Sequence, residues 1–400
     1  MIRDRSILAL TGAELVSRLG SQFTYLALPW FVLVTTGSAT RMGVVFAIEL
    51  VPFVLFGIPA GSVVDRLGPR VTMLVSDAAR APVVALVPFL HLVGGLTYGV
   101  VLAVAFVHGL FSTAYFTCQR VAIPSIVGED EQLVARANSL VEGATNLTTF
   151  AGPGLAGVAI SLIGAANVMW FDAASYVVAF ALIAAFVSVR RRVEADASGG
   201  LWAGVAYLVR DRFVGRAVLT PLLFGLAFPI IIASFPVVAY RQYHHDPRVA
   251  GWLLMAYGGG SVVGSVATYL VLARFKPVPL AVAAAVGLAA PMWLLVPHVP
   301  LGAMILALGV VGFSNPLINA PYFGILSTRV PSALLPKVMQ VIITSNQVAG
   351  PLGYAFAGVL FAAAGLHGAY AIAAAVGTAA SVNFILAILS PSAPAVQEAT

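Results

Sequence analysis

The sequence has few charged residues. Asp, Glu, Lys and Arg make up only 9% of its 400 residues, whereas 60% are hydrophobic. A soluble protein of this length covers its surface with roughly 25% charged residues. This chain cannot do so, and much of its surface must therefore face lipid. The composition excludes an ordinary soluble globular protein.

Cysteine and lysine are scarce as well. Cys118 is the only cysteine, which excludes an internal disulfide and a multi-cysteine metal site. Neither Lys276 nor Lys337 lies in a phosphate-binding GxxxxGK[ST] pattern, so the chain itself is not expected to use ATP. The sequence has no HExxH pattern, and its histidines are scattered. We therefore expect no metal, no cofactor and no enzymatic activity.

Long apolar segments dominate the chain. A bilayer core about 30 Å thick needs roughly 20 apolar residues in each spanning helix. An even number of such helices places both termini on one side of the membrane. Twelve segments are predicted, at 7–35, 41–63, 71–94, 97–119, 139–161, 165–188, 217–240, 250–272, 278–297, 301–325, 338–363 and 367–389.

Lysine and arginine predict the orientation of these helices. Most of them fall in connections on the side of the termini, and only Arg41, Arg241 and Arg248 fall on the other side. Because cytoplasmic loops are enriched in Lys and Arg, both termini are expected in the cytoplasm and the helices in the inner membrane. The net charge of +6 does not indicate a nucleic-acid partner, since the basic residues form no continuous face between aromatic side chains.

The chain is predicted to divide into two halves of six helices. The connection at 189–216 begins with arginines, contains the flexible sequence ADASGG and ends in an amphipathic segment that is expected at the membrane interface. The tripeptide Ala-Gly-Pro at 151–153 recurs at 349–351, in the equivalent helix of the second half. The predicted domains are therefore a bundle at 1–188, this linker, and a second bundle at 217–400.

Two short motifs resemble those of a known family. The sequence GSVVDRLGPR resembles the signature of the major facilitator superfamily, G-x-x-x-D-R-x-G-x-R, and occupies the same loop between the second and third helices. A glycine–proline pattern in the fifth helix resembles the antiporter motif that marks exporters in that superfamily. The motif residues are Gly61, Asp65, Arg66, Gly68 and Arg70 in the loop, and Gly152, Pro153 and Gly157 in the helix.

The segments 17–38, 77–80 and 121–140 are similar to a bacterial branch of that superfamily, which holds macrolide-efflux-type proteins and the enterobactin exporter. The resemblance implies an all-α membrane transporter with two pseudo-symmetric six-helix bundles. Two departures stand out. The fourth helix has His108 and Gly109 where many drug–proton antiporters carry an arginine, and the loop after the eighth helix has no acidic partner for its basic residues.

Asp65 is predicted at the C-terminal end of the second helix, where the helix dipole disfavours a carboxylate. Gly61 and Gly68 are small enough for a tight corner there. Arg66, Arg70 or the N-terminus of the eleventh helix would compensate the charge. The resemblance implies the last, a latch that closes the cytoplasmic side, and a simple salt bridge within the loop is the alternative.

Charges inside spanning helices are costly, so each is a candidate for function. Glu14 and Arg18 are four residues apart on the first helix and are expected to pair. At 1.5 Å per residue, Glu49 on the second helix lies at a depth similar to that of Arg18. Arg18 is therefore predicted to bridge both glutamates, and a proton arriving at either one would free it for the other. The alternative is a permanent structural network.

Three further groups inside the predicted helices have either a functional or a structural role. Asp77 and Arg80, three residues apart near the inner end of the third helix, favour a structural pair that belongs to the conformational motif. Asp172, near the outer end of the sixth helix, would either titrate or anchor the helix. His108 is suited to a proton relay, although a neutral histidine bonded between helices is the commoner arrangement.

The second half has no Asp, Glu, Lys or Arg inside its predicted helices. Such a surface suits an uncharged or amphipathic ligand. Candidates for the substrate cavity are Asn315, Asn319, Tyr322, Asn346 and Gln347. The sequence thus predicts a monomeric proton antiporter that exports small amphipathic molecules, with proton-coupled uptake of a small neutral nutrient as the alternative.

Overall fold

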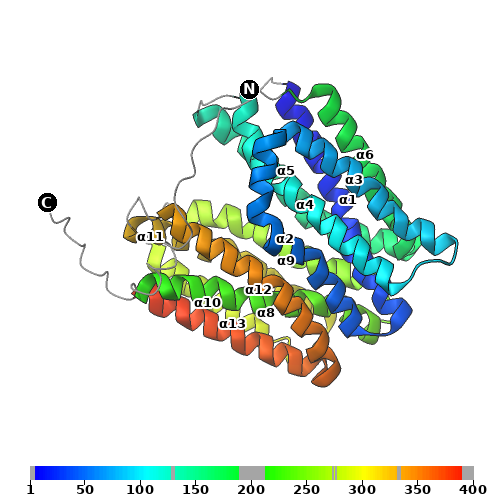
Figure 1. The fold of residues 1–400 in the computed structure, drawn as a ribbon. Coiled ribbons are helices and arrows are strands. Elements are labelled where there is room, and N and C mark those ends of the chain that lie inside the picture. Colours follow the sequence, from blue (N-terminus) through cyan, green and yellow to red (C-terminus); the bar gives the residue numbers. More distant parts are fainter. Residues whose placement is uncertain are drawn as a thin grey trace. The chain divides into compact units, whose positions relative to one another are not determined.

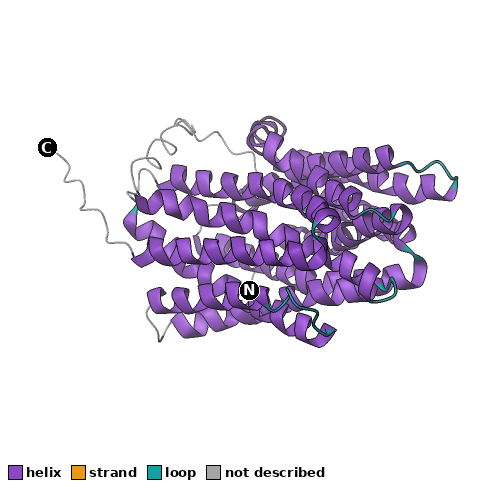
Figure 2. Ribbon diagram, turned by 90° about the horizontal axis from the view of Figure 1, so that it is seen from below, coloured by secondary structure: helices purple, strands orange, loops and turns teal. Residues whose placement is uncertain are grey.

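A computed structural model describes residues 5–127, 131–188, 212–272, 274, 277–330 and 335–389. Within these ranges every regular element is a helix, as Figure 2 shows. The helices, labelled in Figure 1, are α1 Arg5–Thr36, α2 Ala39–Leu67, α3 Pro69–Leu92, α4 Tyr98–Val127, α5 Glu131–Ile163, α6 Ala165–Phe186, α8 Arg212–Gln242, α9 Pro247–Leu272, α10 Pro277–Trp293, α11 Leu301–Arg329, α12 Leu335–Ala363 and α13 Gly365–Leu389.

The predicted all-α membrane fold with twelve helices is confirmed. Among the described residues, nine helices contain a stretch that is long and apolar enough to cross a membrane, and α10 adds a shorter apolar stretch at Val278–Trp293. The predicted flexible linker and amphipathic segment at 189–216 lie outside the described residues, except for residues 212–216. Those residues belong to α8.

The helix ends differ from the predicted segments. α4 runs on to Val127, α5 begins at Glu131, and α8 begins at Arg212. The apolar length criterion detects only the part of a helix that lies in hydrocarbon, and helices continue beyond it. For the same reason the prediction of uncharged helices in the second half is wrong at the helix ends, where α8 includes Arg216 and α11 includes Arg329.

The chain forms two compact units. The first unit comprises Met1–Asp196 and Ala233–Met255, and the second comprises Ala197–Ile232 and Ala256–Thr400. The end of α8 and the start of α9 therefore pack with the first six helices. The division into domains at 189–216 stays a prediction.

Small residues set the helix packing of the first unit. α1 packs on α5 and α6, α2 packs on α4, and α3 packs on α4 and α6. A Cβ atom on Gly109 of α4 would collide with the backbone carbonyl of Glu49 on α2, so only glycine permits this approach. Between α2 and α3 the chain turns at Gly68, whose φ of 81° favours glycine.

Candidate functional site

A cavity of about 270 Å³ opens among α1, α2, α3 and α4 of the first unit. Its wall carries ionisable groups and aromatic side chains, together with serines and a few other residues. Tyr25 and Phe46 meet edge to face with ring centroids 5.4 Å apart, as do Phe53 and Phe116 at 6.5 Å. The ionisable residues in the wall are Glu14, Arg18, Glu49, Arg80, His108 and Tyr115.

Glu14 and Arg18 form the ion pair that their spacing predicted. Arg18 donates through Nε to the Glu14 carboxylate, and both residues line the cavity. The Glu14 side chain is only 1% exposed, whereas that of Arg18 is 30% exposed. The arginine therefore connects a buried carboxylate to the open part of the cavity.

Glu49 meets a partner that the sequence analysis did not assign to it. His108 Nδ1 lies 3.2 Å from Glu49 Oε1, and both side chains are largely buried. The close approach at Gly109 brings the two helices together at this level. Glu14, Arg18 and Glu49 do line one cavity, in agreement with their estimated common depth. The predicted bridging of both glutamates by Arg18 stays a prediction.

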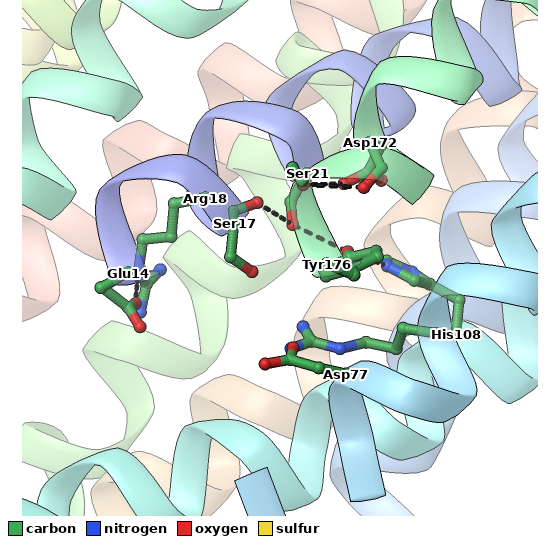
Figure 3. Close-up of polar contacts among 10 residues, drawn as sticks. Glu14, Ser17, Arg18, Ser21, Asp77, His108, Asp172 and Tyr176 are labelled. Atoms are coloured by element: carbon green, nitrogen blue, oxygen red, sulfur yellow. Dashed lines mark hydrogen bonds and ion pairs between the residues drawn. The ribbon is translucent and has the colours of Figure 1, made fainter. Parts of the chain in front are cut away.

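His108 continues into a chain of hydrogen bonds across three helices (Figure 3). Its Nε2 atom lies 2.8 Å from the Tyr176 hydroxyl on α6, which lies 2.9 Å from the Ser21 hydroxyl on α1. Ser21 also donates to the Ser17 carbonyl at 2.9 Å. His108 is thus bonded between helices, and both of its ring nitrogens are engaged. Nothing in the sequence indicated Tyr176.

Asp77 and Arg80 form the buried pair that was predicted on α3. Their Oδ1 and Nη2 atoms are 2.5 Å apart. The Arg80 guanidinium also stacks on Tyr115 and Tyr176, 4.4 Å and 4.3 Å from the ring centroids. Stacking between two rings holds the guanidinium in one orientation, which fits a structural pair.

Asp172 is fully buried, although its sequence position suggested a place near the outer surface. The reason lies on α1, where a Cβ atom on Gly20 would fall 2.7 Å from Asp172 Oδ1, so that glycine alone leaves room for the carboxyl group. The Ser175 hydroxyl lies 3.3 Å from Oδ1. Oδ2 has no hydrogen-bond partner among the described residues.

The loop signature is described only in part. Asp65 lies in the last turn of α2, as predicted, but its side chain and the surroundings of Gly61 lie outside the described residues. Arg66 is exposed, and Arg70 donates to the Ala184 carbonyl of α6 at 2.7 Å. The cytoplasmic latch therefore stays a prediction.

The glycine–proline motif of α5 is a helix contact of the first unit. A Cβ atom on Gly152 would lie 2.6 Å from the Gln22 side chain of α1. On Gly157 it would lie 2.9 Å from the Pro247 carbonyl, at the start of α9. Pro153 lies within the helix. The motif allows α5 to pack closely against both neighbours.

The substrate candidates of the second unit are mostly engaged with their own helices. Tyr322 is buried and donates to the Ala217 carbonyl at 2.7 Å. The exposed Asn346 donates to the Pro221 carbonyl at 3.0 Å. Asn319 donates to Asn315 at 2.8 Å, and Asn315 lies 3.4 Å from the Tyr257 hydroxyl. Gln347 is exposed.

Among the described residues, no group of three or more His, Cys, Asp or Glu side chains is arranged to hold a metal ion. The ionisable groups of the site instead pair with one another.

The chain is similar to known membrane transporters. The Major Facilitator Superfamily matches residues 10–353 of the chain. The multidrug efflux pump Tap of Mycolicibacterium fortuitum is 30% identical over 381 residues, which cover 91% of each chain. Macrolide efflux protein A of Streptococcus pyogenes is 20% identical, with 85% of each chain covered.

Solved structures share the fold. A mutant of the nucleoside transporter NupG superimposes with a TM-score of 0.77 at 13% identity, covering 95% of this chain and 99% of its own. A D-xylose–proton symporter gives 0.72 at 14% identity, with coverage of 95% and 97%. At such identities the likeness concerns architecture alone.

Proposed function

The chain belongs to the major facilitator superfamily and is a multi-pass membrane transporter, and we propose that it exports small amphipathic molecules in exchange for protons. The efflux that the names of Tap and macrolide efflux protein A describe supports the direction. Alternating access, a monomeric state, residence in the inner membrane and cytoplasmic termini are parts of the same proposal.

The charge balance of the first unit carries the proposal. Among the buried and half-buried side chains inside its described helices, away from the helix ends, four carboxylates accompany two guanidinium groups and one imidazole. Uncompensated charge inside a membrane protein is costly. The group can therefore take up a proton, and a coupling site must both take up and release one. Its members are Glu14, Glu49, Asp77 and Asp172, with Arg18, Arg80 and His108.

Two of these four carboxylates line the cavity. Glu49 lines the cavity beside its histidine partner, and Glu14 lines it beside Arg18. Both can exchange protons with water that enters the cavity. The aromatic side chains of the same wall offer apolar contact to an amphipathic substrate. Substrate and protons would thus meet in one place.

We expect Glu49→Gln to abolish accumulation driven by a pH gradient while downhill movement of substrate continues. Glutamine keeps the size of the side chain but cannot carry the proton. The measurement uses inverted membrane vesicles with an acidic lumen and ethidium or erythromycin as the transported probe. Wild-type vesicles treated with a protonophore are the reference. Glu14→Gln should behave in the same way if both carboxylates act as one coupled unit.

Other outcomes decide between the alternatives. Accumulation that survives both glutamine substitutions and the protonophore would exclude these carboxylates and proton coupling together. Accumulation only in right-side-out vesicles with acid outside would favour the uptake of a nutrient.

A further inference from the structure

The hydrogen-bond chain from Glu49 to Ser17 has a direction that depends on one proton. Each hydroxyl of Ser21 and Tyr176 has a single hydrogen to donate, whereas the Ser17 carbonyl can only accept. The Ser21 hydroxyl lies 2.9 Å from that carbonyl and 2.9 Å from the Tyr176 hydroxyl. Its hydrogen can satisfy one of these two oxygens at a time.

When Ser21 donates to the Ser17 carbonyl, the rest of the chain is determined. Tyr176 then donates to Ser21, and its oxygen accepts a hydrogen from His108 Nε2. The contact between His108 Nδ1 and Glu49 now needs a second hydrogen. Either an imidazolium donates to a carboxylate, or a glutamic acid donates to a neutral imidazole. In both cases the pair holds one proton more than ionised Glu49 with neutral His108.

Loss of that proton reverses the chain. The neutral histidine keeps its hydrogen on Nδ1, where it donates to the Glu49 carboxylate, so that Nε2 becomes an acceptor. Tyr176 must then donate to Nε2, and the single Ser21 hydrogen can satisfy either the Ser17 carbonyl or the Tyr176 oxygen, but not both. One proton leaves for water in the cavity, the Tyr176 hydroxyl rotates, and the chain has one hydrogen bond fewer.

We propose that Ser21 and Tyr176 are positioning residues that stabilise the protonated form of the Glu49–His108 pair by this directional chain. The protonated state makes one hydrogen bond more than the deprotonated state, because only in the protonated state do the Ser17 carbonyl and the Ser21–Tyr176 contact both have a hydrogen. The inference rests on the proposed role of the pair in proton coupling. It adds α1 and α6 to the parts of the protein that respond to the proton.

Other charged or titratable groups surround the pair and enter any pH dependence. None of these groups is changed in any variant titrated below. They are Glu14 and Arg18 on α1, Asp77 and Arg80 on α3, Tyr115 on α4, Glu142 on α5 and Asp172 on α6.

Difference titration of purified protein in detergent tests the inference without any substrate. The number of protons bound is measured against pH for each protein and for the same protein with Glu49→Gln and His108→Gln. The difference between the two curves gives the midpoint at which the Glu49–His108 pair takes up its proton. We expect Ser21→Ala to lower this midpoint by about one pH unit, since it removes the one-bond advantage of the protonated state. Tyr176→Phe should lower it by up to about two units, because a charged donor loses its acceptor.

Thr11→Ala is the matched control. Thr11 on α1 donates to the Ile7 carbonyl at 2.9 Å, the same type of bond as that of Ser21. Its removal should leave the midpoint unchanged. An unchanged midpoint in Ser21→Ala would overturn the inference even if Tyr176→Phe failed to fold. Accumulation in vesicles that survives Glu49→Gln, Glu14→Gln and the protonophore, with the midpoint shifted as expected here, would overturn the proposed function alone.

Discussion

The two units treat buried polar groups in different ways. In the first unit the interior carries ionisable side chains that pair with one another, as Asp77 does with Arg80. In the described helices of the second unit, charged residues occur near helix ends, and the interior polar groups are amides and hydroxyls, several of which donate to backbone carbonyls. Arg216 and Arg329 also donate to backbone carbonyls, each to one of α13.

This difference follows from what each unit must satisfy. A proline inside a helix leaves the carbonyl four residues earlier without its donor. In α8 the carbonyl that Pro221 frees is that of Ala217, and the Tyr322 hydroxyl supplies the missing hydrogen. The second unit thus supplies the carbonyl freed by Pro221 with a neutral donor. The first unit keeps costly charges, which a structural role alone would not require.

The largest effect should follow from breaking the buried ion pair of α3. Arg80→Ala leaves the Asp77 carboxylate buried without a cation and removes the stacking on two tyrosines. Removing one partner of a buried pair typically costs about 3–5 kcal/mol. We expect a large drop in the melting temperature of the purified protein in detergent, measured by differential scanning fluorimetry.

The double variant Arg80→Met with Asp77→Leu checks that reason. It removes both charges and fills the space with apolar side chains, so most of the lost stability should return. A double variant as unstable as Arg80→Ala would show that the stacking on the tyrosines, rather than charge balance, holds this part of the first unit together.

Sequence spacing predicted the pairs within one helix and missed the contacts between helices. Glu14 with Arg18 and Asp77 with Arg80 follow from helix geometry alone. The contact of Glu49 with His108 depends on how α2 and α4 are rotated, which the apolar pattern does not specify. Gly109 beside His108 was the only local sign of a close approach. Similarly, the burial of Asp172 depends on Gly20, which lies on another helix.

A smaller effect is expected in the second unit. Tyr322→Phe removes only the hydroxyl, which leaves the Ala217 carbonyl buried without a donor. One such hydrogen bond contributes about 1 kcal/mol to stability. The melting temperature should fall by a few degrees, and the pH dependence of transport should not change, since no ionisable partner of the first unit is touched.

A double-mutant cycle with Pro221→Ala isolates the cause of this effect. Alanine restores the N–H group that the Ala217 carbonyl lacks, so Tyr322→Phe should cost less in that background. If the cost of Tyr322→Phe is the same with proline and with alanine at position 221, the hydroxyl does not serve the freed carbonyl.

The smallest effect concerns an exposed ion pair of the first unit. Asp246 precedes α9, outside the predicted membrane segments, and accepts side-chain hydrogen bonds from Arg248 at 2.8–3.0 Å. These bonds hold the pKa of the Asp246 carboxyl below its usual value of 3.8. A lowered pKa in the folded state adds stability above the unfolded value, and this stability is lost as the pH falls through the folded value.

Arg248→Ala should therefore lower the melting temperature slightly at neutral pH and not at all in strong acid. Solvent competes for the exposed groups, so the effect stays far below that of Arg80→Ala, which breaks the same kind of pair in the interior. The measurement compares the melting temperatures of the wild type and the variant from pH 7 down to about pH 2, so that the scan includes the range in which a carboxyl with a lowered pKa takes up its proton. A difference that widened with falling pH would contradict the assigned cause, because protonation of Asp246 can only weaken its bonds to Arg248. A difference as large as that of the buried pair would remove the distinction between paired charges in the interior and paired charges in water.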